Sequence, residues 1–494
     1  MLDQNQTPLL DALKIYIQHP HAPFYTPGHK QGKGISPKLI EVFGHTIFGA
    51  DLSELTELDN LFAPQGVIDL AQNLAAEAFG ANHTRFLVNG STCGIEAGIL
   101  ATCGEGDKII LPRNIHSSAI SGLIISGAIP IFINPEYDPI SDIAHSITPR
   151  TLEAALRKHP DVKAVMIVYP TYYGVCGDIS AIAQLTHDYN IPLLVDEAHG
   201  AHFAFHPDLP IPALAAGADL SVQSIHKTLG ALTQASMLHV QGERIDIERV
   251  NKALQLVQST SPSYLLLASL DAARQQMALY GKELLSNTLK LSEEAVNHIS
   301  QIPNLLVPLF VSGKLGVTSV DKTRLTVNVS ALGITGFQAD EILEEKLNVY
   351  SELASVQNIT FIISLGNTKQ DIESLVKGFI SLSKNYQNTE SLLPNLRQSS
   401  INVFNRLQSQ VEYHQAISPR QAFFASTQTL PIKETPGKVS AETICPYPPG
   451  IPVLIAGEVI NQDILECLQE VKSQGGFITG CTDCTLNYLN IVYV

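Results

Sequence analysis

Short apolar runs alternate with helix-length segments between about residues 65 and 240. Segment 66–81 (GVIDLAQNLAAEAFGA) has apolar residues at steps of three and four, which predicts an amphipathic helix. The runs that we predict as strands are rich in β-branched residues: 85–88, 108–112, 129–134, 162–170, 191–199 and 218–224. Apolar strands that alternate with helices indicate βαβ units and a mostly parallel sheet buried on both faces. We therefore predict an α/β fold.

Polar residues gather where these predicted strands end. They occupy positions 89–92, 114–116, 171–172, 196–199 and 224–227. In open α/β sheets, ligands bind at the carboxyl ends of the strands. The coincidence of five polar segments with five strand ends predicts one site that several strands build together.

The hydrophobic pattern changes after about residue 285. The stretch from 323 reads as strand, helix, strand and helix, which predicts a second, smaller α/β unit. We expect five parts: an N-terminal arm, a large domain, a small α/β domain, a polar linker and a C-terminal α+β domain that ends in a strand. Their predicted bounds are 1–50, 51–285, 286–384, 385–400 and 401–494.

The composition narrows the possible partners. The 494 residues are 45% hydrophobic and 16% charged, as in a globular protein with a large core. A net charge of -16 disfavours nucleic acid and suits a small cationic substrate better. No basic segment precedes an apolar core at the N-terminus, no run of 18 apolar residues occurs, and the seven cysteines are irregularly spaced. We expect a cytoplasmic protein without a signal peptide or membrane span.

Lys227 is the residue on which a chemical function depends most. It stands in VQSIHKTLGALTQAS (222–236), among small polar side chains that a surface lysine does not need. A lysine amine forms Schiff bases with carbonyls, and pyridoxal phosphate is the commonest carbonyl cofactor held in this way. Such a cofactor needs a carboxylate at its pyridine nitrogen, and Asp196 follows an apolar run at a suitable place.

The phosphate and the ring of such a cofactor also have candidate partners. The turn 89–94 (NGSTCG) comes between a predicted strand and a helical pattern, where a helix N-terminus can face an anion. Ser224 and His226 are further candidate donors, and His116 is a candidate to lie over the ring. Each residue alone has an ordinary explanation as a surface pair, a turn or a core histidine. DEAH (196–199) is also a helicase motif, but no GxxxxGK[ST] loop accompanies it.

The segment around Lys227 resembles the cofactor-attachment signature of the ornithine/lysine/arginine decarboxylase family. Further stretches resemble the same family: 24–32, 51–61, 89–94, 169–175, 196–202, 261–274, 446–454 and 457–458. The resemblance covers nearly the whole chain and is closest to the shorter members, which lack an extra N-terminal domain. AGE stands at 456–458 where PGE is usual, and RNIHSS at 113–118 where some members have a lysine after the histidine.

This resemblance implies an aspartate-aminotransferase-like fold of type I and pyridoxal 5′-phosphate as the cofactor. It implies that Lys227 forms the Schiff base, Asp196 pairs with the pyridine nitrogen, His116 stacks on the ring and Ala198 packs on its other face. The residues expected to hold the phosphate are Ser91, Thr92, Ser224 and His226. After carbon dioxide leaves, Lys227 or His226 is expected to return a proton to the substrate. The catalytic set is then Lys227, His226, His116 and Asp196.

The resemblance also implies a basic L-amino acid as substrate. Arginine, lysine or ornithine would give agmatine, cadaverine or putrescine with carbon dioxide, in polyamine metabolism. The sequence does not separate these three substrates. The family builds each site between two subunits, so we expect a homodimer or a higher homo-oligomer with shared sites.

Acidic side chains are candidates to bind the basic group of the substrate, because a buried cation needs an opposite charge. The segment DLSELTELDN (51–60) holds four acids, although a solvated acidic loop would have the same composition. The candidate substrate-binding residues are Glu54, Glu57, Asp59, Glu458, Thr171 and Tyr264. Which of the acids binds the substrate stays open.

Two other functions remain as alternatives. An aminotransferase or lyase on the same fold would place an arginine at the substrate carboxylate, and Arg85, Arg113 and Arg274 are not obviously placed for that. A non-catalytic regulator would not need the pair of Lys227 and Asp196. A CxxC motif at 481–484 lacks further zinc ligands, so we expect no metal there. It is either a redox pair or part of a turn.

Overall fold

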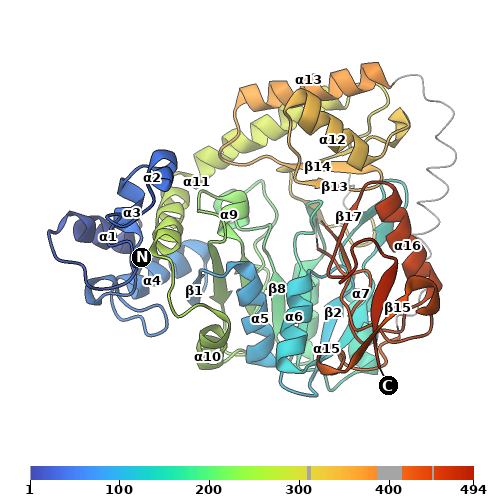
Figure 1. The fold of residues 1–494 in the computed structure, drawn as a ribbon, viewed down its shortest axis with the longest axis horizontal. Coiled ribbons are helices and arrows are strands. Elements are labelled where there is room, and N and C mark those ends of the chain that lie inside the picture. Colours follow the sequence, from blue (N-terminus) through green and yellow to red (C-terminus); the bar gives the residue numbers. More distant parts are fainter. Residues whose placement is uncertain (1, 309–312, 387–413, 448–449, 494) are drawn as a thin grey trace. The chain divides into compact units, whose positions relative to one another are not determined.

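The computed structural model describes residues 2–308, 313–386, 414–447 and 450–493 (Figure 1). The chain divides into two compact units, one made of Met1–Thr102 and Pro192–Leu285 and the other of Cys103–Ile191 and Ser286–Val494. Most of the predicted linker and the first residues of the predicted C-terminal domain (387–413) lie outside the described residues. The five predicted domain bounds stay predictions.

Four strands form the sheet of the first unit, in the order β1, β10, β9 and β8. Strands β8 (Leu193–Asp196) and β9 (Leu220–Gln223) are parallel, whereas β10 (Ser236–Val240) is antiparallel to β9 and to β1 (His83–Leu87). Every residue of β8, β9 and β10 is buried. Burial on both faces explains why β8 reads as a continuous apolar run instead of an alternating one. Strand β10 was not predicted, because SMLHV mixes polar with apolar residues.

Glycine lets one helix of the first unit lie close to this sheet. Helix α5 (Gly90–Thr102) packs with Gly94 against β1 and β9, where an added Cβ would come within 2.7 Å of the side chains of Leu87 and Val222. The N-terminus of α5 is thereby placed beside the end of β1. The other helices of this unit are α1 (Pro8–Gln18), α2 (Pro37–Phe43), α3 (Thr46–Ala50), η1 (Thr56–Leu58), α4 (Val67–Phe79), η2 (Phe203–Phe205), α9 (Ile225–Thr228), α10 (Ile247–Val257) and the first part of α11 (Tyr264–Ile299).

The second unit begins with three parallel strands in the order β6, β2 and β3. They are β2 (Lys108–Pro112), β3 (Ile129–Ile133) and β6 (Ala164–Val168), and all three fall within predicted runs. The segments between and after them form α6 (Ser117–Ser126), β4 (Tyr137–Asp138), β5 (Ile143–Ala144), α7 (Pro149–Lys158), β7 (Val175–Cys176) and α8 (Ile179–Asp188). The predicted α/β fold with a mainly parallel sheet is confirmed.

The strand–helix–strand–helix pattern predicted for the stretch from residue 323 is also confirmed. Strand β14 (Asn358–Ile362) lies between β12 (Arg324–Asn328) and β13 (Leu353–Ala354), and both neighbours are antiparallel to it. Helices α12 (Gly336–Leu347) and α13 (Lys369–Asn385) lie together on one side of β13 and β14 (Figure 1). They share one apolar core with these strands and the end of α11. Two further short elements are β11 (Ser319–Val320), which precedes β12, and η3 (Ser330–Leu332), which lies between β12 and α12.

The last described segment of the second unit has its own apolar core, centred on α16 (Gln462–Ser473). Two antiparallel strand pairs accompany this helix, β15 with β18 and β16 with β17. The elements are α15 (Pro419–Phe424), β15 (Thr427–Pro431), η4 (Ile432–Glu434), β16 (Cys445–Tyr447), β17 (Phe477–Thr479) and β18 (Tyr488–Val492). The predicted final strand is therefore confirmed. No helix in the described ranges has the length and apolar character that a membrane span requires.

Candidate active site

Lys227 lies on the single turn of helix α9, directly after the buried strand β9. Its Nζ is 3.1 Å from Nε2 of His199. Backbone hydrogen bonds fix this turn, because the N–H of Lys227 donates to the carbonyl of Ser224 and the N–H of His226 donates to the carbonyl of Ala235. The backbone that carries the amine is therefore fixed by hydrogen bonds at the carboxyl end of a strand.

Asp196 is the last residue of β8 and is buried. One of its carboxylate oxygens, Oδ1, accepts a hydrogen bond from the N–H of Ala198 at 3.2 Å. The next residue, Glu197, donates its N–H to the carbonyl of Val222 on β9. Since β8 and β9 are parallel and Asp196 is paired with Val222, the carboxyl ends of both strands lie at the same edge. This edge brings the segment 196–199 and the segment 224–227 together, as predicted.

The predicted phosphate residues lie at two neighbouring places in the first unit. Ser91 is in the first turn of α5, and its Oγ lies 2.9 Å from Oγ of Ser224. Gly90 begins this helix with φ of 75°, a conformation that favours glycine. The hydroxyls therefore meet at a helix N-terminus, where N–H groups favour an anion. Thr92 is exposed in the same turn.

His226 has a backbone partner of its own. Its Nδ1 accepts a hydrogen bond from the N–H of Gln234 at 3.0 Å. Burial and then the nearby charge of Lys227 lower the pKa of His226 below its ordinary value. The ring is therefore biased toward the neutral form, with its proton on Nε2.

The predicted site residues His116 and Thr171 belong to the second unit. His116 precedes α6, and its Nδ1 accepts a hydrogen bond from the N–H of Ser118. Thr171 is buried, and its hydroxyl accepts a hydrogen bond from the N–H of Val175 at 3.2 Å. Both residues follow strands of the second unit, as the sequence predicted.

The predicted acids of segment 51–60 differ sharply in their surroundings. The carboxylate of Asp59 accepts hydrogen bonds from five backbone N–H groups, including those of Gly66 and Ile68 at the start of α4. Burial alone would raise the pKa of Asp59, but these N–H groups lower it below the ordinary value. Glu54 accepts from the side chain of Asn60 and from the N–H of Leu61. These two acids therefore organise their own loop and helix.

Glu57 differs from the two acids beside it. Its side chain is exposed on η1, and within the described residues it makes no hydrogen bond or ion pair. Tyr264 is fully buried and donates its hydroxyl to the carbonyl of Asp59 at 2.7 Å. Of the three acids predicted here, Glu57 therefore keeps its carboxylate available for a ligand.

Glu458 is buried in an ion pair within the second unit. Its Oε2 accepts hydrogen bonds from Nη2 of Arg113 at 3.0 Å and from the N–H of Ile455 at 2.8 Å. Arg113 also donates to the carbonyl of Val453. Burial raises the pKa of Glu458, and the charge of Arg113 opposes that shift. The pair ties residues 453–458 to the residue that follows β2.

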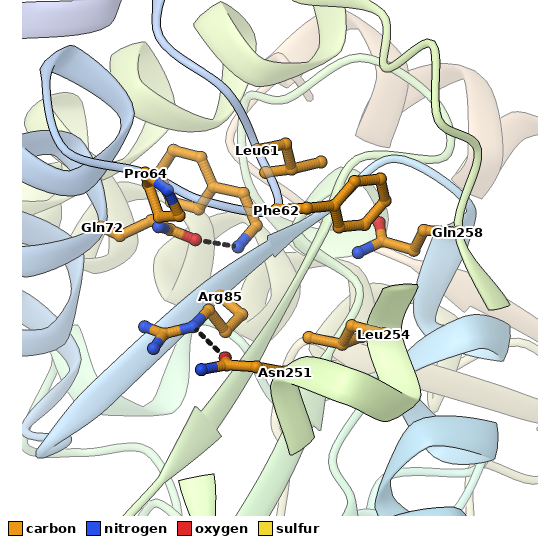
Figure 2. A pocket seen from close by; sticks show the side chains of 9 residues that line it. Leu61, Phe62, Pro64, Gln72, Arg85, Asn251, Leu254 and Gln258 are labelled. Carbon is orange, nitrogen blue, oxygen red and sulfur yellow. Dashed lines mark hydrogen bonds between the residues drawn. The ribbon is translucent and has the colours of Figure 1, made fainter. Parts of the chain in front are cut away.

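The three arginines considered for a substrate carboxylate all have structural partners. Arg274 is fully buried, pairs with Asp271 and donates to backbone carbonyls of the N-terminal segment. Arg113 pairs with Glu458, as described above. Arg85 donates through Nε to Oδ1 of Asn251 at 2.8 Å (Figure 2) and through Nη1 to the carbonyl of Thr84.

Figure 2 shows the small cavity that Arg85 lines together with Gln72 and the loop that carries Leu61. The amide oxygen of Gln72 accepts the N–H of Phe86 at 3.0 Å. The cavity has a volume of about 40 Å³. Sites for small organic ligands usually have several hundred Å³, whereas this volume suits a few water molecules. It is therefore not the substrate site.

Glu197, the residue after Asp196, belongs to a buried network of polar side chains. Sequence reasoning did not single out this network. The carboxylate of Glu197 accepts hydrogen bonds from Ser221 Oγ, Gln223 Nε2 and the N–H of Ala213. The other end of the Gln223 side chain contacts His239 Nε2 at 3.2 Å. Burial raises the pKa of Glu197 to about 7, and the three hydrogen bonds oppose that shift. Glu197 thus joins the Asp196 turn to β9 and to residue 213.

We expect Glu197 to make folding stability depend on pH. In the unfolded chain its carboxyl titrates near 4.5, whereas in the folded protein its pKa is about 7. Its contribution to stability is full below pH 4.5 and is lost as the pH rises to about 7, because the folded state favours the protonated form. Between about pH 5 and about pH 8, the wild type should lose about 2 kcal/mol more unfolding free energy than Glu197→Gln, measured by urea denaturation.

Glu243→Gln is the matched control for this measurement, because Glu243 is exposed in the same unit. It should follow the wild type at both pH values. Equal pH dependence in the wild type and in Glu197→Gln would show that the buried carboxyl does not titrate in this range.

His199 is the second residue that sequence reasoning missed. It lies in the polar segment 196–199 that was singled out, but no role was predicted for it. Its only signal was this position after a predicted strand. The contact with Lys227 joins residues 28 positions apart and becomes visible only in the fold.

All seven cysteines are free thiols. Cys481 and Cys484 lie in one turn, with Cys484 Sγ 4.0 Å from the carbonyl of Cys481. Burial and then Cys484 raise the pKa of Cys481 to about 11. The motif keeps both of its interpretations, as a redox pair and as part of a turn. In the described ranges, no group of three or more His, Cys, Asp and Glu side chains is arranged to hold a metal ion.

Comparison with protein families decides what kind of protein carries this site. The model described as Orn/Lys/Arg decarboxylase, major domain, matches residues 7–371, and that of the Orn/Lys/Arg decarboxylase C-terminal domain matches residues 401–478. The chain belongs to the Orn/Lys/Arg decarboxylase family. It is a pyridoxal phosphate-dependent amino-acid decarboxylase. The resemblance read from the motifs is confirmed.

Individual relatives agree with this assignment. The chain is 38% identical to an arginine decarboxylase of Bacillus subtilis (strain 168), over 99% of both chains. It is 39% identical to an arginine decarboxylase of Bacillus anthracis, over 99% of this chain and 98% of the relative. The solved structure of lysine decarboxylase A from Pseudomonas aeruginosa superposes with a TM-score of 0.84, covering 98% of this chain and 80% of that one at 23% identity. This last likeness confirms the predicted type I fold.

The residues at the edge of β8 and β9 fit the cofactor that the family implies. A carbonyl needs an amine, and Lys227 Nζ is held at this edge. A protonated ring nitrogen needs a buried carboxylate, and Asp196 is 6% exposed. A phosphate needs hydroxyl and N–H donors, and Ser91 and Ser224 meet at the N-terminus of α5. The three chemical requirements are met within one unit of the chain.

Proposed function

We propose that this protein decarboxylates L-arginine to agmatine and carbon dioxide with pyridoxal 5′-phosphate as cofactor. The observation that carries the proposal is the placement of Lys227 and Asp196 at one edge of the sheet, after β9 and β8. Arginine is favoured among the basic amino acids because two relatives named arginine decarboxylase match nearly the whole chain at 38% and 39% identity. The lysine decarboxylase with a similar structure is only 23% identical. Agmatine production would place the enzyme in polyamine metabolism.

We assign the roles of these residues from the resemblance of their motifs to the family. Lys227 binds the carbonyl of the cofactor, and Asp196 keeps the pyridine nitrogen protonated. Ser91, Thr92, Ser224 and His226 would hold the phosphate, and His116 and Ala198 would contact the ring. Pyridoxal phosphate, when bound, supplies the electron-accepting ring that decarboxylation requires. The protein supplies orientation and electrostatic stabilisation.

Incubation of the purified protein with arginine, lysine and ornithine tests the function directly. We expect carbon dioxide and the corresponding amine to form fastest from arginine, at catalytic amounts of protein with added cofactor. A 2-oxo acid formed in place of carbon dioxide would identify an aminotransferase. Faster turnover of lysine or ornithine would overturn the choice of substrate while leaving the reaction in place.

We propose a homodimer in which each site takes an acid from the partner subunit, because the substrate carries a distal cation. A guanidinium left unpaired in a closed pocket would cost several kcal/mol. Glu57 supports this role best among the predicted acids, since its carboxylate is exposed and makes no hydrogen bond or ion pair in the described ranges. Asp59 and Glu54 serve backbone and loop groups of their own chain.

Glu57→Gln should raise KM for arginine about tenfold to a hundredfold, because the distal cation loses its partner. Cofactor binding should not change. Asp59→Asn is the matched control: it should lower the unfolding free energy by about 1 kcal/mol through weaker capping of α4, with KM near that of the wild type. Steady-state kinetics and thermal unfolding separate the two effects.

Mixed subunits test whether the site is shared. Lys227→Ala chains combined with Glu57→Gln chains should regain activity, because some hybrid dimers hold one intact composite site. No recovery in a mixture shown to contain hybrids would place both residues in one chain. A rise in KM for Asp59→Asn but not for Glu57→Gln would exchange the proposed roles of the two acids.

A further inference from the structure

The buried imidazole of His199 contacts the amine on which the proposed function depends. Its Nε2 lies 3.1 Å from Nζ of Lys227, within hydrogen-bond distance. The side chain of His199 is 4% exposed, whereas Lys227 is half-buried. A buried histidine placed directly against a reactive amine suits proton transfer with that amine.

The fold holds His199 at this place through the turn that follows β8. The N–H of Ala198 donates to Asp196, the N–H of Glu197 donates to Val222, and the N–H of Gly200 donates to the carbonyl of Glu197. The carboxylate of Glu197 anchors the same turn to Ser221 and Gln223 of β9. Since β9 leads directly into α9, the turn and the lysine share one rigid support.

His226, the other histidine beside Lys227, has a backbone group as its hydrogen-bond partner. His226 precedes the lysine in sequence, and its Nδ1 accepts the N–H of Gln234. Its pKa is lowered by burial and by the charge of Lys227, so it is a poor acceptor for a second proton. His199, in contrast, directs Nε2 at the lysine amine. If Nε2 accepts the hydrogen bond, the neutral ring carries its proton on Nδ1.

We propose that His199 is the acid–base residue of Lys227, taking a proton from its ammonium group when the lysine binds the carbonyl cofactor and returning it when the lysine is released. The inference rests on the proposed function. A free lysine amine has a pKa of about 10.4 and is mostly protonated near neutral pH, and an ammonium cannot attack a carbonyl. After one proton moves to His199, the neutral amine adds to the carbonyl carbon. A carbon–nitrogen double bond replaces the carbon–oxygen bond, and the oxygen leaves as water with the two remaining amine protons.

Other titratable groups lie on the elements that carry this pair and on the strand next to them. Asp196, Glu197 and His202 share the turn with His199, His226 lies on α9, and His239 lies on the neighbouring strand β10. Burial lowers the pKa of His239 to about 3, so it stays neutral across the range of the test. A change of one histidine must therefore be compared with the same change at another.

The experiment measures how fast cofactor-free protein captures pyridoxal 5′-phosphate, without substrate. Rapid mixing followed by visible absorbance gives the rate constant from about pH 6 to about pH 9. His199→Asn keeps a polar side chain but has no titratable nitrogen. At about pH 7.5, we expect its rate constant to fall about tenfold or more below that of the wild type. Its pH profile should shift upward, toward the ordinary pKa of lysine.

Two control variants and one control ligand make the result specific. His83→Asn removes an exposed histidine of the same unit and should behave as the wild type. Lys227→Ala should give no absorbance change. Pyridoxamine 5′-phosphate has no carbonyl, and it should bind His199→Asn as tightly as it binds the wild type.

Each other outcome has one meaning. Equal rate constants and pH profiles for His199→Asn and the wild type would overturn the role of His199. Weakened pyridoxamine 5′-phosphate binding in His199→Asn would also overturn it, because the histidine would then only maintain the shape of the site. Capture by Lys227→Ala at the wild-type rate would instead refute the proposed function, since the carbonyl would be held by another residue.

Discussion

Lys227→Ala should retain its fold but lose arginine decarboxylation by about a thousandfold or more, as expected when the group that binds a cofactor covalently is removed. The wild type should be yellow with bound cofactor, and borohydride should attach the cofactor to Lys227 irreversibly. Peptide mapping by mass spectrometry locates the modified residue, and circular dichroism checks the fold. The effect should be large because α9 presents this amine from a fixed position after β9.

Lys252→Ala is the matched control, since Lys252 is exposed on α10 in the same unit. It should keep full activity. A reduced cofactor found on another lysine would refute the assignment of the site, whatever the activity of the variants. Strong residual turnover in Lys227→Ala would do the same.

Asp196→Asn should bind cofactor yet turn over arginine about a hundredfold to a thousandfold more slowly, as when other single electrostatic stabilisers are removed. Asparagine can still accept the hydrogen bond from the N–H of Ala198, so the turn after β8 should keep its shape. What it lacks is the negative charge that keeps the pyridine nitrogen protonated. Measuring kcat alongside cofactor affinity distinguishes this loss from a loss of binding.

Asp208→Asn serves as the control, because Asp208 is an exposed acid that follows η2 in the same unit. Its kcat should equal that of the wild type. Near-normal kcat in Asp196→Asn would exclude the proposed role of its charge. A parallel loss of cofactor and of kcat would indicate that Asp196 mainly holds the cofactor in place.

The main strands of the fold were predictable because a strand that is buried on both faces gives a short apolar run in the sequence. A strand such as β2 (Lys108–Pro112) must be apolar along most of its length, and the predicted run 108–112 has the same bounds. Strand β10 was missed because its histidine, His239, is buried in a hydrogen-bonded network with Gln223 and Thr84. A buried polar side chain with partners from distant segments cannot be recognised from its own neighbours.

The acids of segment 51–60 also show that the partners of a polar side chain cannot be read from its neighbours in sequence. In sequence, Glu54, Glu57 and Asp59 are three similar carboxylates within six positions. In the structure, Asp59 binds the backbone at the start of α4, Glu54 binds Leu61, and Glu57 is exposed. Which of these carboxylates is available for a ligand depends on which of them bind backbone groups in the folded loop.

By itself, the sequence determined the α/β class and the family, and it singled out Lys227 and Asp196 as candidate site residues. These follow from local patterns: apolar runs, the polar residues that end them, and short motifs. Only the tertiary structure decided which side chains meet, because hydrogen bonds and ion pairs depend on distance in space. Arg113 and Glu458 pair across 345 positions, and His199 reaches Lys227 across 28. The parallel register of β8 and β9 brings that last contact about, since it sets the turn after one strand beside the helix after the other.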